Sequence, residues 1–527
     1  MGHVMLKKLP LDIQTFRELR ESNYLYVDKT EYAYNLITGG RRFFLSRPRR
    51  FGKSLFVSTL HEILSGNKEL FTDLWIGRSN YEWKKHPVIS LSLSSLDIKS
   101  IDLFEKSLCN ALQKIAEQYS ITSLNFDRTP KSLFMDLIEA LHKKFGKVAI
   151  LVDEYDYPIL RSLDNEAYAI EIRDALRDFF IIIKDLDASI AFVFITGVSS
   201  FAKAGIFSGL NNLQILTLND TYGTILGYTD EEVDHYFKDY MQAWSEKKNI
   251  SYQQLRQEIK TWYNGYHFSA HSFAVYNPFS LMNAFNEYSF KNFWIQSGPP
   301  SFLMREITKG YRNKQLRMFD IESISLDEDD LGTIDIGAIP LPTLIFQTGY
   351  LTIDTYDTDS KLYKLKFPNA EIKHSFQKLL FNLIVQDDPI AGRELLQDLK
   401  QALIENDMEK MIDILKQLFS RIPNQLLATQ EKFYHAILQI FFDIAGIKSQ
   451  SEYATGHGRI DIVLELPKCM YIIETKLNQS PTMALEQIEE KRYWEPFLKF
   501  GKLIILLGLS FERGSGTFDI TYAMKKL

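Results

Sequence analysis

Cysteine is scarce in this chain of 527 residues, which contains only Cys109 and Cys469. Two cysteines provide neither a disulfide framework nor a full set of zinc ligands, so we expect a protein of the reducing cytoplasm. The N-terminus has no apolar signal-peptide core, and the most apolar window, residues 179–195, is interrupted by Lys184 and two aspartates. The sequence therefore predicts a cytoplasmic protein without a membrane segment.

An overall positive charge is also missing. Lys and Arg number 61 against 67 Asp and Glu, giving a formal net charge of −6, so no global field draws the chain onto nucleic acid or a membrane. Contact with a polyanion must come from a local patch. One such patch lies between positions 41 and 53, where no acid occurs and the basic residues are Arg41, Arg42, Arg47, Arg49, Arg50 and Lys53.

This basic patch overlaps a candidate phosphate-binding loop. The apolar run 43–45 predicts a strand, and the loop after it ends in Gly52-Lys53-Ser54 before a segment of helical periodicity. In that context the helix N-terminus favours an anion, the lysine reaches the β- and γ-phosphates, and the serine binds Mg²⁺. Arg47 stands where the usual motif has glycine, so an ordinary helix start on a basic surface is the alternative.

A later apolar segment carries acids at its end. Residues 147–152 predict a strand buried on both faces, and Asp153 and Glu154 follow directly. Ligands of parallel α/β sheets bind at the carboxyl ends of the strands. We therefore expect Asp153 to hold Mg²⁺, Glu154 to polarise the attacking water, and the hydroxyls of Thr196 and Ser199 to sense the γ-phosphate. A solvated strand end is the alternative for the two acids.

The order of predicted elements gives the fold class. Predicted strands at 43–45, 87–93, 147–152, 191–195 and 213–218 alternate with predicted helices at 30–38, 55–64, 102–118, 130–145 and 165–186. This alternation is typical of a three-layer α/β domain with a mainly parallel sheet. Helices are predicted from an N-cap at Thr229 to about Tyr263. The aromatic turns that follow indicate either packing or a helical lid over the nucleotide.

A boundary is expected near 318–335. This stretch contains Asp320, Glu322, Asp327, Glu328, Asp329, Asp330 and Asp335, and we interpret it as a solvated linker. After it, residues 344–353 and 361–367 predict two strands around a turn, and helices are predicted over 371–420. His267 and His271 are spaced i, i+4, but their segment lacks helical character and acids, so no metal site is predicted there.

Two apolar strands near the C-terminus flank a turn at Pro467-Lys468. If the turn is centred there, Asp461 and Glu474 are directly opposed and share a face of an antiparallel pair. Lys476, two residues further, points the same way. Two carboxylates suit Mg²⁺ or Mn²⁺, and the lysine would orient a nucleophile. An exposed polar edge with a Glu-Lys pair is the alternative.

The chain resembles the AAA-ATPase-like family of bacterial proteins, whose members commonly carry a C-terminal module of the PD-(D/E)XK nuclease superfamily. The resemblance covers nearly the whole chain. The motifs that carry it are RPRRFGKSL, LVDEYDYP, WYNGYHF, YNPFS, LIFQTGYL, FPNAE, EKFYHAIL, GRIDIVLE and IIETKL. It implies that Asp461, Glu474 and Lys476 form the nuclease signature, with Glu431, Glu452 and Gln487 as auxiliaries. Arg47 resembles the family's own variant of the phosphate loop.

The expected fold is α/β, with a P-loop NTPase-type parallel sheet and helical lid, a middle α+β region and a restriction-endonuclease-like α/β domain. The expected segments are a core at 1–225, a lid at 226–317, the linker and middle region at 318–424, and the nuclease-like domain at 425–527. The expected cofactor-binding residues are Arg47, Arg50, Gly52, Lys53, Ser54, Asp153 and Thr196. The expected catalytic residues are Glu154, Asp461, Glu474 and Lys476, and the expected metal ligands are Ser54, Asp153, Asp461 and Glu474.

The function expected from these residues is ATP binding and hydrolysis coupled to Mg²⁺- or Mn²⁺-dependent cleavage of nucleic acid. DNA is expected as the substrate in preference to RNA. A nucleotide-dependent switch or scaffold with an inactive nuclease-like module is the alternative. An ATP-driven protein remodeller is a third hypothesis, which needs a homo-oligomer with arginines contributed by a neighbouring subunit. Three alternative roles stay open for Arg47, Arg49 and Arg50. They could bind phosphates, reach a neighbouring subunit or contact nucleic acid.

Overall fold

The computed structural model divides the chain into two compact units. The first unit comprises Met1–Glu306 and Glu322–Ile372, and the second comprises Ile307–Ile321 and Lys373–Leu527. The division falls within helix α18 (Ala370–Ile384). The structure describes residues 6–201, 205–207, 210, 212–296, 303, 306–307, 324–332, 334, 336, 340–385, 389–422, 430–513 and 518–527.

A five-stranded sheet forms the centre of the first unit. Its strands run in the order β2-β3-β4-β1-β5, and each neighbouring pair is parallel. The strands are β1 (Arg42–Ser46), β2 (Val88–Ser92), β3 (Val148–Asp153), β4 (Ile190–Gly197) and β5 (Gln214–Ile215). Strand β4 lies between β1 and β3, so the carboxyl ends of these three strands meet at one edge. This arrangement confirms the predicted α/β class.

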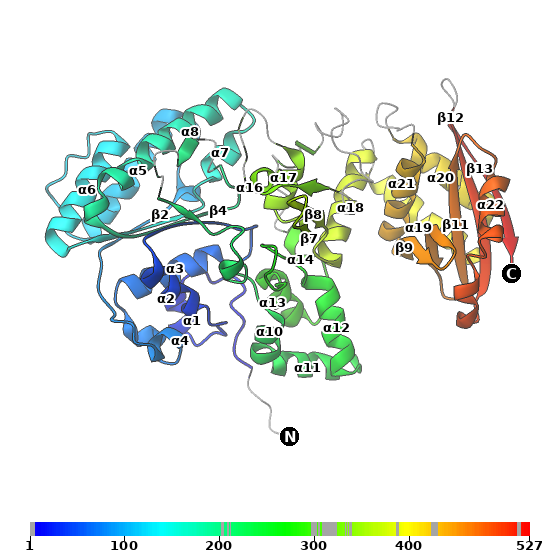
Figure 1. Cartoon of the computed structure of the whole chain (residues 1–527), viewed down its shortest axis with the longest axis horizontal. Helices are drawn as coiled ribbons and strands as arrows, with labels where there is room; N and C mark the ends of the chain where they lie inside the picture. The colour runs from blue at the N-terminus through cyan, green and yellow to red at the C-terminus, as the bar shows by residue number, and fades with distance from the viewer. Residues whose placement is uncertain are drawn as a thin grey trace. The chain divides into compact units, whose positions relative to one another are not determined.

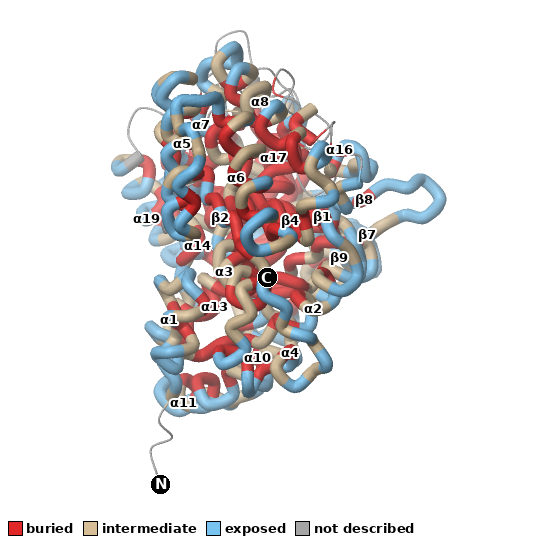
Figure 2. The backbone as a smooth tube through the Cα atoms, turned by 90° about the vertical axis from the view of Figure 1, so that its left-hand side faces the viewer, coloured by how far each residue is buried: buried red, intermediate tan, exposed pale blue. Residues whose placement is uncertain are grey.

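Helices cover both faces of this sheet. Every residue of β1 and β3 is buried, as expected for apolar strands enclosed on both sides (Figure 2). Figure 1 shows α3 on one side and α5, α6 and α8 on the other. The bounds of these and the neighbouring helices are α1 (Phe16–Glu21), α2 (Thr30–Gly39), α3 (Lys53–Leu64), α4 (Trp75–Arg78), α5 (Ile101–Gln118), α6 (Pro130–Phe145), α7 (Tyr157–Ser162), α8 (Glu166–Phe180) and α9 (Ile182–Asp185).

Helices α10 to α14 form a second core within the first unit. They are α10 (Asp230–Tyr236), α11 (Lys238–Lys248), α12 (Tyr252–Tyr263), α13 (Pro278–Glu287) and α14 (Phe293–Gln296). As predicted, Thr229 begins α10, and its hydroxyl and the Glu232 carboxylate make a capping box. Buried Tyr263 and Tyr276, from the two aromatic turns, belong to one apolar cluster of these helices together with Phe237, Trp244 and Phe285. These two turn residues therefore serve packing, as one of the two interpretations expected.

The middle of the chain differs from the prediction. Residues 341–347 form helix α17 (Leu341–Gln347), so a strand over 344–353 was wrong in its first half, and β7 (Thr352–Asp357) starts later. A short apolar run has no periodicity of its own, and Pro342 at the first turn favours the helix. The other elements are β8 (Leu362–Lys366), β6 (Ser325–Leu326) and α16 (Glu328–Gly332), with the sheet order β6-β8-β7.

Two of these middle elements lie in the acidic stretch, while Asp320, Glu322 and Asp335 lie outside the described residues. Two predicted elements are also shorter than expected. The strand over 213–218 is reduced to the two residues of β5, and the helix over 165–186 is divided into α8 and α9.

The second unit is built on a mixed sheet. Its order is β13-β12-β11-β10-β9, and only β11 and β12 pair in parallel. Helix α21 packs on β9 and β11, while α22 packs on β11 and β12. The bounds are α19 (Pro389–Glu405), α20 (Met408–Ser420), α21 (Glu431–Ile444), β9 (Lys448–Thr455), β10 (Gly458–Glu465), β11 (Cys469–Leu477), α22 (Pro481–Glu490), β12 (Leu503–Arg513) and β13 (Phe518–Lys526).

The hairpin register in this unit confirms the prediction. Leu466 donates its N–H to the Cys469 carbonyl across the turn, and Ile462 pairs with Ile473. Continuing this register by one residue sets Asp461 opposite Glu474. Helix α22 ends at Glu490, and β13 was not predicted.

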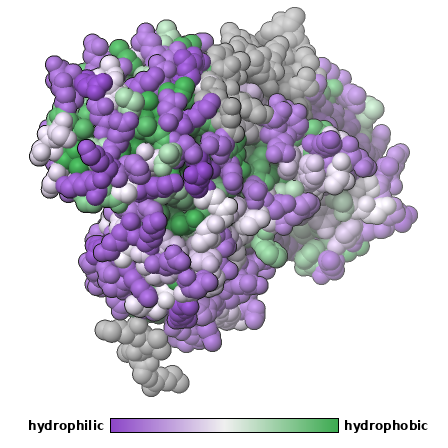
Figure 3. Space-filling view, turned by 60° about the vertical axis from the view of Figure 1, so that its left-hand side comes forward, coloured by the Kyte–Doolittle hydropathy of each residue, from purple (hydrophilic) through white to green (hydrophobic). Residues whose placement is uncertain are grey.

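Within the described residues, no helix is long and apolar enough to cross a membrane. Hydrophilic side chains cover most of the face drawn in Figure 3. The segment 179–195, the most apolar window of the sequence, ends in the buried strand β4.

The substitution Gly197→Ala should destabilise the first unit. An added Cβ would lie 2.5 Å from the Asp156 carboxylate and 2.7 Å from the Tyr155 ring, so we expect a loss of about 1–3 kcal/mol in the free energy of unfolding. Gly39→Ala is the matched control, because nothing lies within 4 Å of its Cβ position in α2. Urea unfolding of both variants measures the difference. Equal stability of Gly197→Ala and the wild type would contradict this packing.

Candidate nucleotide and metal sites

The phosphate loop connects β1 to α3 and is shaped by two left-handed residues. Gly52, directly before the helix, has φ +89°, and Arg50 has φ 67°. The left-handed conformation costs residues with a Cβ about 1 kcal/mol or more, which explains the glycine at position 52. The turn sets the N-terminus of α3 beside the carboxyl end of β1. Free backbone N–H groups of a helix start are suited to an anion there.

The side chain of Lys53 holds this loop closed. Its ammonium group donates hydrogen bonds of 2.9 Å to the carbonyls of Arg47 and Pro48, and the residue is 7% exposed. Burial lowers the pKa of Lys53, and the nearby negative charge of Asp153 opposes that effect. The lysine therefore bonds to the loop carbonyls and lies close to the acids at the end of β3.

Asp153 and Glu154 end β3 next to this lysine. Burial raises the pKa of Asp153, and the nearby Ser54 hydroxyl and the charge of Lys53 oppose that rise. The Asp153 carboxylate also accepts the N–H of Glu154 at 3.0 Å. Glu154 has φ 52°, a conformation that is rare for residues other than glycine and that concentrates at functional sites. The structure thus brings together four of the predicted residues, Lys53, Ser54, Asp153 and Glu154.

A cavity of about 830 Å³ opens over Lys53, Ser54 and Glu154, and Asp153 is not among its described lining residues. Gly52, Lys53, Ser54 and Glu154 line it, and so does Arg50, whose guanidinium lies 4.6 Å from the centre of the Phe279 ring. The other walls come from the N-terminal segment, α7 and the start of α13, with apolar side chains such as Leu25, Val27, Tyr228, Phe279 and Met282. Ligand pockets typically hold roughly 300–1,000 Å³, so the volume is sufficient for a nucleotide.

Arg47 faces away from this cavity. Its guanidinium donates to the carbonyls of Ser46 at 2.9 Å, Thr217 at 2.8 Å and Tyr222 at 3.0 Å, and it stacks 4.2 Å from the Phe268 ring centre. The residue is 1% exposed, and burial lowers its pKa to about 9. These bonds tie the loop to the segment after β5. The arginine that replaces the glycine of the usual motif therefore stabilises the conformation of the loop.

Thr196 ends β4 as predicted, but it is fully buried. Its hydroxyl has no hydrogen-bond partner among the described residues, and it is not among the described residues that line the cavity. Ser199 is buried as well, and its N–H donates to Asp156 at 2.6 Å. Burial raises the pKa of Asp156 to about 6. Sequence reasoning did not select Asp156, although the LVDEYDYP motif contains it.

Behind the phosphate loop lies a buried contact through Trp294. Its indole N–H donates to the Arg49 carbonyl at 3.3 Å, and its backbone N–H donates to the Glu371 carboxylate at 2.8 Å. Glu371 is fully buried near the start of α18, and burial raises its pKa to about 7. A chain of bonds thus leads from the loop to the helix in which the first unit ends.

In the second unit, Asp461 and Glu474 meet across two strands. The Asp461 N–H points to a Glu474 oxygen at 3.4 Å, and the Asp461 carboxylate accepts from the N–H and hydroxyl of Thr475 at 2.8 and 2.7 Å. Glu474 is 1% exposed and accepts from Gln487 at 2.9 Å. Burial, and then the charge of Asp461, raise the pKa of Glu474 to about 8. Two such groups repel unless a cation or a proton lies between them.

Lys476 lies near the same acids. Its ammonium group lies 3.6 Å from the Glu431 carboxylate at the start of α21, and burial raises the pKa of Glu431 against the opposing charge of Lys476. Two of the predicted auxiliaries therefore contact the signature residues: Glu431 lies beside Lys476, and Gln487 donates to Glu474.

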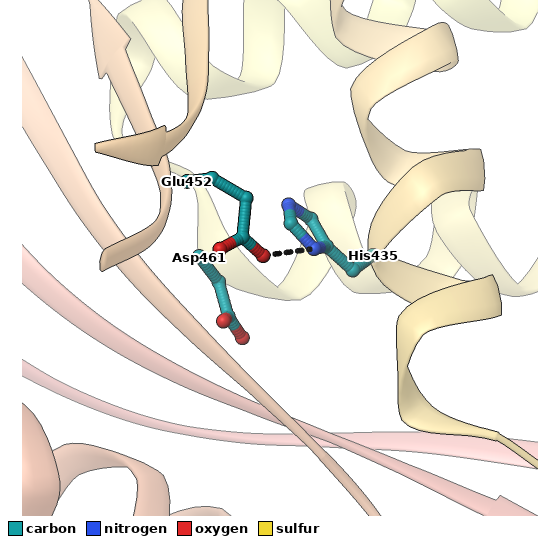
Figure 4. Close-up of side chains that lie close together, drawn as sticks. All are labelled: His435, Glu452 and Asp461. Carbon is teal, nitrogen blue, oxygen red and sulfur yellow. Dashed lines mark ion pairs between the residues drawn. The ribbon is translucent and has the colours of Figure 1, made fainter. Parts of the chain in front are cut away.

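A third group on the neighbouring strand extends the cluster. Glu452 of β9, His435 of α21 and Asp461 of β10 each offer a ligand atom, and these atoms lie within 4.8 Å of one another (Figure 4). The His435 imidazole lies 3.7 Å from Glu452, and its Nε2 is buried without a hydrogen-bond partner among the described residues. Sequence reasoning missed His435. The available signal was its spacing of i, i+4 from Glu431 within the EKFYHAIL motif.

The donor set of this cluster fits a divalent cation. Carboxylate oxygens suit Mg²⁺ and Mn²⁺, and an imidazole nitrogen shifts the preference toward a transition metal such as Mn²⁺. His435 adds a buried ring nitrogen that has no hydrogen-bond partner among the described residues and is available to bind such an ion. Asp461 is common to both groupings, Asp461–Glu474 and His435–Glu452–Asp461.

Comparison with known proteins agrees with this division. Residues 10–207 match the family described as "Predicted AAA-ATPase", and residues 429–519 match the "PD-(D/E)XK nuclease superfamily". A protein of Azotobacter chroococcum mcd 1, named "Uncharacterized protein in vnfD 5'region", is 35% identical over 523 residues, which is 97% of each chain. Its name assigns no activity. The two domains suggest ATPase and nuclease roles and interaction with ATP and nucleic acid.

The variant Glu371→Gln should change the pH dependence of stability. A folded-state pKa of about 7 means that the folded chain binds an extra proton above pH 4.5, so wild-type stability falls as the pH rises toward and past 7. The total loss is about 3 kcal/mol at most, since one pKa unit corresponds to about 1.4 kcal/mol. Asp156 and Glu474 also have raised pKa values, so we expect thermal unfolding at pH 5 and pH 8 to show a loss in all three proteins, and a smaller loss in Glu371→Gln than in the wild type and the exposed control Glu139→Gln. The same pH dependence in all three proteins would contradict the assignment.

Proposed function

Because the chain belongs to the family of predicted AAA-ATPases that carry a C-terminal PD-(D/E)XK nuclease superfamily domain, we propose that it hydrolyses ATP and cleaves nucleic acid, DNA before RNA. One observation carries the proposal. Two separate sets of residues suited to phosphate chemistry occur in one chain, around Lys53 and Asp153 in the first unit and around Asp461 and Lys476 in the second.

In the first unit the chain's own residues bind the triphosphate and orient a water. The N–H groups at the start of α3 and the Lys53 ammonium group contact the β- and γ-phosphates, for which Lys53 exchanges its bonds to the loop carbonyls. Ser54 and Asp153 would hold Mg²⁺, which would neutralise charge on the phosphate oxygens. Glu154, on the cavity wall, accepts a proton from the attacking water.

In the second unit the acids hold a divalent cation and the lysine acts beside it. Asp461 and Glu474, with His435 and Glu452 nearby, would hold Mn²⁺ or Mg²⁺, which supplies an activated water and stabilises charge on the phosphate. Lys476 orients the nucleophile or contacts the scissile phosphate. Gln487 fixes the Glu474 carboxylate through its hydrogen bond of 2.9 Å.

A nucleotide-dependent switch with an inactive nuclease-like unit is the second candidate. The observation that favours it is that Asp461 and Glu474 are engaged by Thr475 and Gln487, so each carboxylate already has protein partners. We also retain as proposals the four segments at 1–225, 226–317, 318–424 and 425–527, a cytoplasmic location and a homo-oligomer. Part of the lid and linker boundary lies outside the described residues.

The variant Lys53→Ala should lose ATP binding without unfolding. Removing one charge-assisted hydrogen bond to phosphate weakens binding by roughly 10- to 100-fold. Calorimetric titration with ATP and Mg²⁺ measures the affinity, and thermal unfolding shows whether the fold persists. Lys68→Ala, on the exposed surface of the same unit, is the matched control. Wild-type affinity in Lys53→Ala would rule out the proposed nucleotide site.

Asp461→Ala and Lys476→Ala should each remove metal-dependent cleavage and leave ATP hydrolysis intact. Loss of a metal ligand or of a positioned cation lowers the rate on the order of 100-fold or more. Labelled single- and double-stranded DNA and RNA, incubated with Mn²⁺ or Mg²⁺, report the cleavage. Lys468→Ala in the exposed turn of the same hairpin is the control. Cleavage that persists in both site variants would show that the hairpin is not the nuclease centre.

A further inference from the structure

During ATP hydrolysis, negative charge on the γ-phosphate oxygens is redistributed in the transition state. A positive group that contacts these oxygens mainly in the transition state speeds the reaction, in addition to the groups that bind ATP in the ground state. An arginine in this position increases the rate by roughly 10³–10⁵-fold in related chemistry. The sequence did not identify such an arginine. The cavity over the phosphate loop has five basic residues in its described lining, and their contacts distinguish them: Lys29, Arg49, Arg50, Lys53 and Arg161.

Two of these five residues have ammonium groups held by an ion pair or by carbonyls, and a third, Arg50, belongs to the phosphate loop. Lys29 is buried and forms an ion pair with Glu232 at 2.7 Å, Lys53 bonds to the loop carbonyls, and the Arg50 guanidinium stacks on Phe279. Arg49 belongs to the phosphate loop, and its charge lowers the pKa values of Lys53 and Tyr350. Arg49 is therefore placed beside the cation that binds the ground state.

Arg161 has a different surrounding. Among the described residues, no carboxylate forms an ion pair with its guanidinium, and its side chain is exposed. Its Nε donates to the Tyr157 hydroxyl at 3.3 Å, and the guanidinium carbon lies 5.6 Å from the centre of the Tyr157 ring. Tyr157, Arg161 and Glu154 all line the cavity.

The position of α7 directs Arg161 toward Glu154. The helix starts directly after the acids of β3, and the Tyr157 N–H donates to the Glu154 carbonyl at 3.1 Å. Residues i and i+4 share a helix face, and side chains lean toward the helix N-terminus, so Arg161 reaches back over Tyr157. Buried Ile159 and Leu160 fix the helix on the core. Arg161 and Glu154 thus line the same cavity, one from α7 and the other from the segment directly before it.

We propose that Arg161 is the catalytic arginine of the nucleotide site, supplied by the same chain that binds the ATP. The inference rests on the proposed ATP hydrolysis. In that step the water oxygen bonds to the γ-phosphorus, the bond from phosphorus to the bridging oxygen breaks, and ADP leaves with the electron pair. Glu154 takes the proton of the water, and the products are ADP and phosphate. Arg161 keeps its proton and exchanges its contact with Tyr157 for the γ-phosphate oxygens.

Steady-state phosphate release and ATP titration test this role together. For Arg161→Ala we expect kcat to fall on the order of 10³-fold, while the ATP dissociation constant changes by less than about threefold, because the contact forms mainly in the transition state. Arg161→Lys keeps the charge and should recover part of kcat. Arg177→Ala is the matched control, since Arg177 is a surface arginine of α8 that pairs with Asp174.

Mixing two inactive variants tests whether the arginine acts within its own chain. Lys53→Ala lacks the binding lysine and Arg161→Ala lacks the arginine, so a mixture stays inactive if both residues serve the same chain. Recovery of activity in the mixture would overturn the proposal, because it would show that the arginine acts on a neighbouring subunit. A kcat of Arg161→Ala within about twofold of the wild type would also overturn it. A wild-type protein that releases no phosphate would instead overturn the proposed ATP hydrolysis, and this inference with it.

Discussion

The buried ammonium group of Lys53 is the interaction on which the first site depends. It is nearly enclosed, it bonds to the carbonyls of Arg47 and Pro48, and it lies near Asp153. A buried cation without such partners would cost several kcal/mol. The loop carbonyls and the acid at the strand end therefore stabilise the buried charge of this lysine together. A bound phosphate would take over the lysine's bonds from the carbonyls, so the loop is arranged to respond to a nucleotide.

The second site poses the opposite electrostatic problem. There the charges that crowd together are negative: Asp461, Glu474 and Glu452 come from three adjacent strands of one sheet. Thr475 and Gln487 donate hydrogen bonds to these carboxylates, and burial together with the charge of Asp461 still raises the pKa of Glu474. In both sites a ligand of opposite charge would balance a charge of the protein. A phosphate would balance the ammonium group of Lys53, and a cation would balance the carboxylates of the second site.

The sequence predicted the elements whose signals are local and strong. The all-buried β3 with its terminal acids, the capped start of α10 and the hairpin around Pro467-Lys468 are confirmed, because periodicity, caps and turns depend on a few neighbouring residues. Helix α17 was missed because an apolar run of this length is compatible with helix or strand. Arg47, Asp156 and His435 could not be assigned their contacts, since these depend on segments distant in sequence.

Cleavage of labelled DNA by the wild-type protein, with Mn²⁺ and ATP varied independently, tests the central claim most directly. The claim is that one chain combines a nucleotide site with a metal-dependent nuclease centre. It predicts cleavage that requires the metal and whose rate changes when ATP is added. An absence of cleavage with every metal and nucleotide combination, on both single- and double-stranded substrates, would contradict it.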